Sequence, residues 1–145
     1  MRNASQIIEQ WEAMSMERLR AAKALLDGGF YRDSVSRSYY AAYCAATSRV
    51  ILLAGQFAQG RRNPSHEQLP DLIANTASIT VLARRKMIRA LRFLRHVRED
   101  ADYRPHALVN RSVALDSIHN AILVQNLLNI GEKENDQAGS GTKSA

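Results

Sequence analysis

The sequence is poor in cysteine, proline and glycine, and it lacks a long hydrophobic run. The one cysteine in 145 residues, Cys44, excludes an internal disulfide and a cysteine-rich zinc site. Residues 50–55 form the longest aliphatic run, far below the roughly 20 apolar residues that a membrane-spanning helix needs. The first helical segment carries three glutamates and no apolar signal core, so we expect a soluble, cytoplasmic protein.

Three prolines and seven glycines leave long segments in which apolar residues recur at three- and four-residue spacing. No segment alternates with a period of two residues, so no sheet is expected. A shorter helix is expected between Ser65 and Ser78, after a loop at 55–65. The pattern predicts an all-α fold, an antiparallel up-down four-helix bundle with a short extra helix between the second and third long helices. The long helices are expected at about residues 5–26, 31–54, 83–103 and 108–130.

The ends and inward faces of these helices are also readable. Gly28 and Gly29 should end the first helix and Gly55 the second, because glycine accepts left-handed geometry. The third helix should end near Tyr103, since Pro105 disfavours helix in the residue before it. Its predicted seam has strict four- and three-residue spacing: Ala83, Met87, Ala90, Leu94, Val97 and Ala101. The predicted inward residues of the last helix are Leu115, Ile118, Ile122 and Leu128.

The last 15 residues, 131–145, contain no aromatic side chain and no aliphatic one larger than alanine. Such a segment cannot bury enough apolar surface to offset the entropy of ordering, so we predict a disordered C-terminal tail. Residues 1–130 then form the helical bundle, with 18 basic and 11 acidic residues and a net charge of +7.

Positive charge is concentrated on the third long helix. From Arg84 to Arg98 there are seven basic residues and no acidic one. Helical spacing gathers Arg85, Arg89, Arg92 and His96 into one stripe, and puts Arg84, Arg95 and Arg98 on its flank toward the seam. One interpretation is a solvated basic face. The other is a binding surface for an anionic partner, such as RNA, a nucleotide or an acidic antitoxin, because like charges one turn apart destabilise a helix. The candidate anion-binding residues are Arg85, Arg89, Arg92 and Arg95.

No set of histidine and acidic residues has metal-ligand spacing, so neither a metal nor another cofactor is expected. Cys44 lies among alanines and is interpreted as an inert core thiol. His96 is interpreted as a surface residue and His119 as a structural one. The Arg-x4-His spacing of Arg61 and His66 lies in a loop and is interpreted as a coincidence.

Three segments in order resemble the HEPN domain family, over roughly residues 15–130. They are LLDGGFYRDSVSRSYYAAYCAA (25–46), a histidine after a polar loop (His66), and LRHVREDADYRP (94–105). The small stand-alone branch of the family is the most similar. The resemblance implies a helical bundle that forms a homodimer. It also implies, in active members, metal-independent RNA cleavage by an Arg-x4–6-His motif from each protomer, with the arginine on the phosphate and the histidine in proton transfer.

The matching arginine is Arg98, but Tyr103 stands where the motif would place its histidine, and His106 comes only beyond Pro105. An unperturbed tyrosine titrates near 10 and is a poor base at neutral pH. Tyr103 resembles instead a tyrosine that a partner nucleotidyltransferase modifies in some family toxins. His66, leaning into the cleft, would then be the alternative acid or base.

The remaining candidates surround Arg98. Asp102 lies one helical turn after it, at salt-bridge spacing. Tyr39 and Tyr40 are interpreted either as core aromatics or as cleft supports that bond Asp102 or orient Arg98. We predict a toxin or defence component that cleaves RNA without metal through Arg98 and either His66 or Tyr103. The alternative is a non-catalytic module that binds a nucleotide, RNA or a nucleotidyltransferase antitoxin. A third reading is an oligomerisation bundle whose charge serves solubility.

Overall fold

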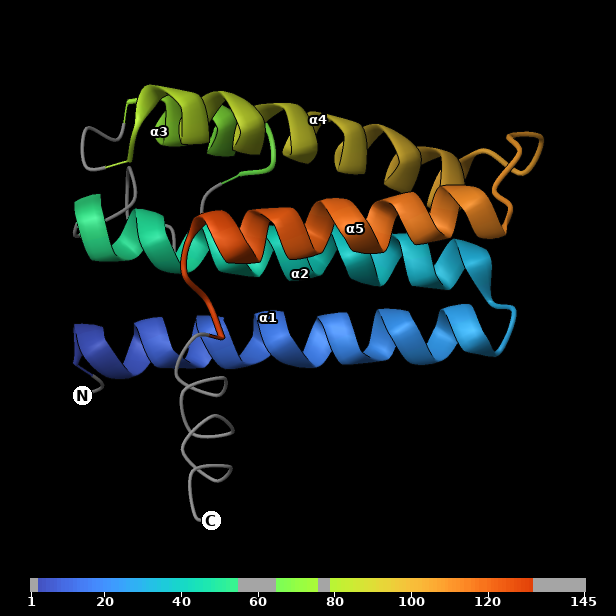
Figure 1. The fold of residues 1–145 in the computed structure, drawn as a ribbon, viewed down its shortest axis with the longest axis horizontal. Helices are drawn as coiled ribbons and strands as arrows, with labels where there is room; N and C mark the ends of the chain where they lie inside the picture. The colour runs from blue at the N-terminus through green and yellow to red at the C-terminus, as the bar shows by residue number, and fades with distance from the viewer. Residues whose placement is uncertain (1–2, 55–64, 76–78, 132–145) are drawn as a thin grey trace, which may run out of the picture.

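The computed structural model describes residues 3–54, 65–75 and 79–131, and this part of the chain holds five helices and no strand. The all-α prediction is confirmed, including the short helix between the second and third long ones. The long helices run side by side along the molecule, with α3 beside α4 (Figure 1). The helices are α1 (Ala4–Asp27), α2 (Tyr31–Ala54), α3 (Leu69–Ala74), α4 (Val81–Tyr103) and α5 (Arg111–Leu127). Most of the predicted loop at 55–65, with Gly55, and all but the first residue of the predicted tail lie outside the described residues.

Local capping explains where the helices begin and end. The Asn3 side chain accepts a hydrogen bond from the Gln6 backbone N–H at 2.8 Å, and the Gln6 side chain accepts one from the Asn3 N–H, so α1 starts one residue earlier than predicted. Gly29 has a φ of 82°, which fits its predicted role at the end of α1. Helix α5 begins at Arg111, three residues later than predicted, because the Asn110 side chain caps it through the Val113 N–H.

Helix α2 is the centre of the bundle and contacts each of the other four helices. Its buried residues are mostly small, with alanines and serines that let neighbouring backbones approach closely. Buried serines pair across these contacts: the Ser15 hydroxyl donates to the Ala41 carbonyl at 2.6 Å and the Ser34 hydroxyl to the Ala22 carbonyl at 2.8 Å. These two hydrogen bonds satisfy buried hydroxyls where helices pack closely, whereas the buried Thr47 hydroxyl has no partner among the described residues.

The predicted seam of α4 is buried from Met87 to Ala101, with Ala83 half-buried at its start. The prediction for α5 needs a correction, because Leu115 and Ile122 are only half-buried. The predictions for Ile118 and Leu128 are confirmed, because both are buried. The rest of the face that meets the bundle carries smaller residues, which allow α5 to pack against α2: Ala114, Ser117, Ala121 and Val124. Within the described ranges, no helix is long and apolar enough to span a membrane.

Candidate functional site

Arg98 lies near the C-terminal end of α4, on the side that faces α2. Its side chain is only 13% exposed. The guanidinium carbon is 5.3 Å from the ring centre of Tyr39, 5.6 Å from that of Tyr40 and 5.6 Å from that of Tyr103. Three tyrosine rings therefore surround a cation that is largely removed from water, an arrangement that favours the charged form of arginine.

The polar contacts of Arg98 hold it in place without using all its donors. Its Nη2 donates to the Tyr40 hydroxyl at 3.3 Å, and its Nε is 3.4 Å from Asp102 Oδ2. That carboxylate oxygen also accepts from the Ser36 hydroxyl at 3.3 Å. The buried Nε lacks a well-aligned hydrogen bond, so Asp102 attracts Arg98 chiefly by charge. Within the described ranges, the Nη1 nitrogen makes no hydrogen bond or ion pair.

The pKa of the Arg98 guanidinium reflects these neighbours. Burial by itself lowers this pKa, but Tyr40, Tyr103 and Asp102 together outweigh burial and raise the pKa above its usual value. Arg98 is therefore cationic at every physiological pH. The Tyr40 hydroxyl accepts a hydrogen bond from Arg98, whereas Asp102 is bonded by Ser36 and by neither Tyr39 nor Tyr40 within the described part of the chain.

His66, which precedes α3, packs against the same tyrosines. The group is called the Arg98 cluster below, and its members are Tyr39, Tyr40, Tyr43, His66, Arg98, Asp102 and Tyr103. Its ring centre lies 4.6 Å from that of Tyr43, 5.4 Å from Tyr39 and 6.0 Å from Tyr40. Its Nδ1 is hydrogen-bonded to the Tyr39 hydroxyl. Burial, with the charges of Arg98 and Arg95, lowers the pKa of His66 below its ordinary value, so the ring is neutral at pH 7.

The Tyr39 hydroxyl is the hydrogen-bond partner of Nδ1 in that neutral ring. Burial raises the pKa of Tyr39 well above its usual range, so the hydroxyl keeps its proton. When Tyr39 donates this proton to Nδ1, the hydrogen of the neutral imidazole sits on Nε2. His66 in this state offers a ligand an N–H donor rather than a basic lone pair.

Arg32, a residue that the sequence interpretation missed, fixes the end of α4 where this cluster lies. Its Nη1 donates to the carbonyl oxygens of Asp100, Ala101 and Arg104 at 3.0–3.1 Å. Its Nη2 donates to those of Pro105 and Ala107 at 3.1 and 2.7 Å. One side chain of α2 thus contacts carbonyls at the end of α4 and in the segment after it, and of these Asp100 and Arg104 also accept from backbone N–H groups. The acceptors lie 68–75 residues away in sequence, so no local pattern reveals them.

The predicted basic stripe on α4 is exposed at Arg85, Arg89 and Arg92, and none of the three has an acidic partner among the described residues. Arg95 differs, because its guanidinium lies 3.7 Å from Glu67 and 3.5 Å from Glu99. The α4 arginines without an acidic partner therefore lie in the part of this helix that precedes Arg98 in the sequence.

The other candidates lie apart from this cluster. Cys44 is buried, and burial raises the pKa of its thiol to about 11, as an inert core thiol requires. His96 is exposed and lies 3.6 Å from Asp100, and His106 and His119 are also exposed. Arg61 lies outside the described residues. No group of three or more metal-ligating side chains is present in the described ranges.

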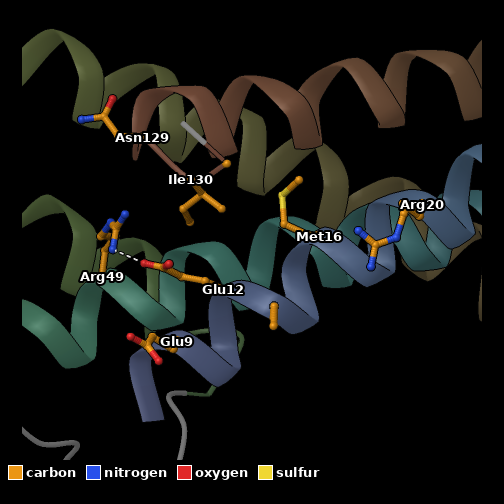
Figure 2. Close-up of a pocket in the computed structure, with 9 residues that line it drawn as sticks. Glu9, Glu12, Met16, Arg20, Arg49, Asn129 and Ile130 are labelled. Carbon is orange, nitrogen blue, oxygen red and sulfur yellow. Dashed lines mark hydrogen bonds and ion pairs between the residues drawn. The ribbon is translucent and has the colours of Figure 1, made fainter. Parts of the chain in front are cut away.

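A pocket of about 610 Å³ lies between α1, Arg49 of α2 and the residues that follow α5 (Figure 2). Figure 2 shows Met16 and Ile130 in it, with Glu12 paired to Arg49 at 2.5 Å. The Arg49 Nε also donates to the Leu128 carbonyl at 3.0 Å. Because these contacts join α1, α2 and the chain after α5, we interpret the Glu12–Arg49 pair as a structural tie.

No curated protein matches the chain as a relative. The chain does match a protein family, the HEPN domain, over residues 8–130. The matched region contains all five helices of the described structure, apart from the first turn of α1, and every residue of the Arg98 cluster. On this evidence the protein belongs to the HEPN domain family.

Proposed function

We propose that this HEPN protein acts on RNA, which it binds along the basic face of α4 with a backbone phosphate at Arg98. The observation that carries the proposal is the row of three exposed, unpaired arginines, Arg85, Arg89 and Arg92, on the helix that ends at the Arg98 cluster. At 1.5 Å per residue, Arg85 and Arg98 are about 20 Å apart along the helix, the length of several nucleotides. The three arginines lie roughly 120–180° around the helix from Arg98, so an anionic polymer would have to curve around α4 to contact both the stripe and the cluster.

The charge distribution favours a phosphate backbone over a small anion. An arginine without an acidic partner can meet a phosphate without first breaking an ion pair, and its planar guanidinium binds phosphate oxygens in pairs. Each phosphate neutralised on a single strand changes the slope of log K against log salt by about 0.7. Three arginines should thus contribute about 2 to that slope.

Fluorescence anisotropy with a labelled single-stranded RNA tests this proposal. Replacing Arg85, Arg89 and Arg92 with glutamine should weaken binding at least tenfold at low salt and should reduce the salt slope by about 2. Equal affinities for the wild type and this triple variant would contradict the proposal.

A matched control removes the same charge from other helices. Arg20, Lys23 and Arg37 are exposed on α1 and α2. Their replacement with glutamine should change the affinity much less, because these side chains lie off the α4 stripe. Equal losses in both triple variants would show that net charge alone drives binding.

A homodimer is part of the proposal and rests on family membership. Large apolar side chains are exposed at the end of the bundle where Arg32 joins α2 to the α4–α5 loop. These exposed side chains are Phe30, Tyr103 and Leu108, and Tyr103 is 71% exposed. Figure 1 shows that the α1–α2 turn lies at this same end. A second copy would cover them and bring two Arg98 sites into one cleft, and sedimentation equilibrium checks the expected dimer mass. In a protomer that has not yet paired, the exposed Tyr103 hydroxyl is open to a nucleotidyltransferase antitoxin, in keeping with a toxin or defence role.

RNA cleavage without metal is the second candidate, and it is favoured by the position of His66 beside Arg98. In such cleavage the ribose 2′-hydroxyl loses its proton and attacks phosphorus, the bond to the 5′-oxygen breaks, and that oxygen takes a proton. The His66 Nε2–H would stabilise the developing negative charge, and Arg98 would hold the phosphate. When Tyr39 donates to Nδ1, the neutral ring has no free lone pair for the first proton. The geometry therefore supports binding better than cleavage.

Incubation with mixed RNA in chelator separates the two candidates. Binding without cleavage is the expected result, and Arg98→Ala should weaken that binding. Cleavage that disappears in Arg98→Ala would instead establish the second candidate. Cleavage that persists in Arg98→Ala would point to a contaminating nuclease and would require repurification before the comparison is repeated.

A further inference from the structure

A second, smaller pocket lies directly beside His66, between α3 and α4. Its volume is about 150 Å³, similar to an engineered cavity that admits one benzene ring. It shares Tyr39 and His66 with the Arg98 cluster, so a ligand in it would lie next to a phosphate held by Arg98. The residues around it are Tyr39, His66, Glu67, Leu69, Pro70, Asp71, Leu91, Arg92 and Arg95.

The surfaces of this pocket combine apolar walls with polar groups of both signs. Leu69 and Leu91 are buried and Pro70 is half-buried, which provides apolar surface for a flat ring. The α3 side supplies two carboxylates, Glu67 and Asp71, and α4 supplies the guanidinium groups of Arg92 and Arg95. Hydrogen-bond acceptors therefore come from one side and donors from the other.

These acceptors are accessible. The Glu67 side chain is 83% exposed, and its 3.7 Å ion pair with Arg95 is held weakly at such exposure. The Asp71 carboxylate is exposed and has no partner among the described residues. A ligand with N–H donors could engage either carboxylate without displacing a buried contact.

We propose that this pocket takes one nucleobase that carries an exocyclic amino group, and that the base is cytosine. The proposal rests on the proposed binding of RNA and names its preferred base. The cytosine amino group donates to carboxylates, while its carbonyl oxygen and ring nitrogen accept from guanidinium groups. Uracil has a carbonyl in place of the amino group and would leave Glu67 and Asp71 opposed by oxygen. A single ring fits a volume of about 150 Å³ better than the double ring of a purine.

Anisotropy with labelled 12-nucleotide homopolymers of cytidine, uridine and adenosine at pH 7.5 tests this inference. The wild type should bind oligocytidine roughly five- to tenfold more tightly than oligouridine. The double variant Glu67→Gln, Asp71→Asn should bind the two alike, without loss of oligouridine affinity, because removal of negative charge does not weaken phosphate contacts.

The matched control is Glu9→Gln, Asp116→Asn, which removes two exposed carboxylates from α1 and α5. This variant should keep the cytidine preference. Equal wild-type affinity for oligocytidine and oligouridine would overturn the base pocket and leave the proposed RNA binding standing. Tighter binding of oligoadenosine than of oligocytidine would overturn the assignment to a single-ring base. Absence of binding to all three polymers would instead refute the proposed function.

Discussion

Replacement of Arg32 with alanine removes the side chain that holds the C-terminal end of α4 against α2. Its two terminal nitrogens contact five backbone carbonyls, from Asp100 to Ala107, at 2.7–3.1 Å. Each terminal nitrogen carries two hydrogens, so at most four of the five contacts act as full hydrogen bonds. The change leaves the carbonyls of Ala101, Pro105 and Ala107 without a donor among the described residues, whereas those of Asp100 and Arg104 keep backbone N–H donors.

The expected loss is about 3 kcal/mol of unfolding free energy. A hydrogen bond to a charged group contributes roughly 1.5–3 kcal/mol net, and contacts that share one side chain do not add. Two of the five contacts are exposed, where water replaces the donor, so the total stays near the value for one or two buried bonds. For a chain of this size, such a loss lowers the melting temperature by about 6–12 °C.

Urea unfolding followed by circular dichroism measures this loss, with Arg37→Ala as the matched control. Arg37 is exposed on the same helix, and its replacement should change the free energy by less than about 0.5 kcal/mol. Hydrogen exchange provides a local readout, because the Arg104 amide donates to the Asp100 carbonyl at the end of α4 and should lose protection in Arg32→Ala. If Arg32→Ala is no more destabilising than Arg37→Ala, the reasoning about the helix end is wrong.

Two further outcomes concern buried titratable groups. Because burial, with Arg98 and Arg95 nearby, holds the pKa of His66 below its ordinary 6.5, the folded state resists protonation. The free energy of unfolding, measured by urea titration between pH 5 and 7.5, should therefore fall as the pH drops below 6.5. The fall should be less steep in His66→Gln than in the wild type or in the control His119→Gln. Identical slopes in all three proteins would contradict this. Burial raises the pKa of the Cys44 thiol to about 11. At pH 8 the thiol should therefore react with iodoacetamide at least about tenfold more slowly in the folded protein than in urea, as measured by mass spectrometry. Equal rates would show that the thiol is accessible.

The elements that could be predicted from the sequence are those with a local physical cause. The α4 seam is readable because its other face is strongly charged, so the apolar stripe from Met87 to Ala101 is unambiguous. The last helix is less readable, since apolar residues occur around much of it and small ones such as Ala114 and Ala121 face the bundle. Its predicted inward residues Leu115 and Ile122 are half-buried for that reason.

The candidate site divides in the same way. The pairing of Arg98 with Asp102 follows from helical spacing, and the exposed stripe follows from helix geometry and an absence of nearby acids. The position of His66 was open in the sequence, because a residue after a loop can point outward or inward. Its bond to Tyr39 joins residues 27 positions apart, and only the packing of the segment before α3 against α2 brings them together.

The sequence by itself determined the helices, their order, most of their ends and the charged face of α4, because periodicity, capping and charge act between residues one or two turns apart. The tertiary structure alone decided that Arg32 closes the end of α4, that three tyrosine rings surround Arg98, and that Tyr39 is hydrogen-bonded to His66. Each of these contacts joins different helices or segments, so it depends on the distance and the angle at which the helices pack. The small residues along α2 permit this close packing, but no local pattern in the sequence specifies its distance or angle.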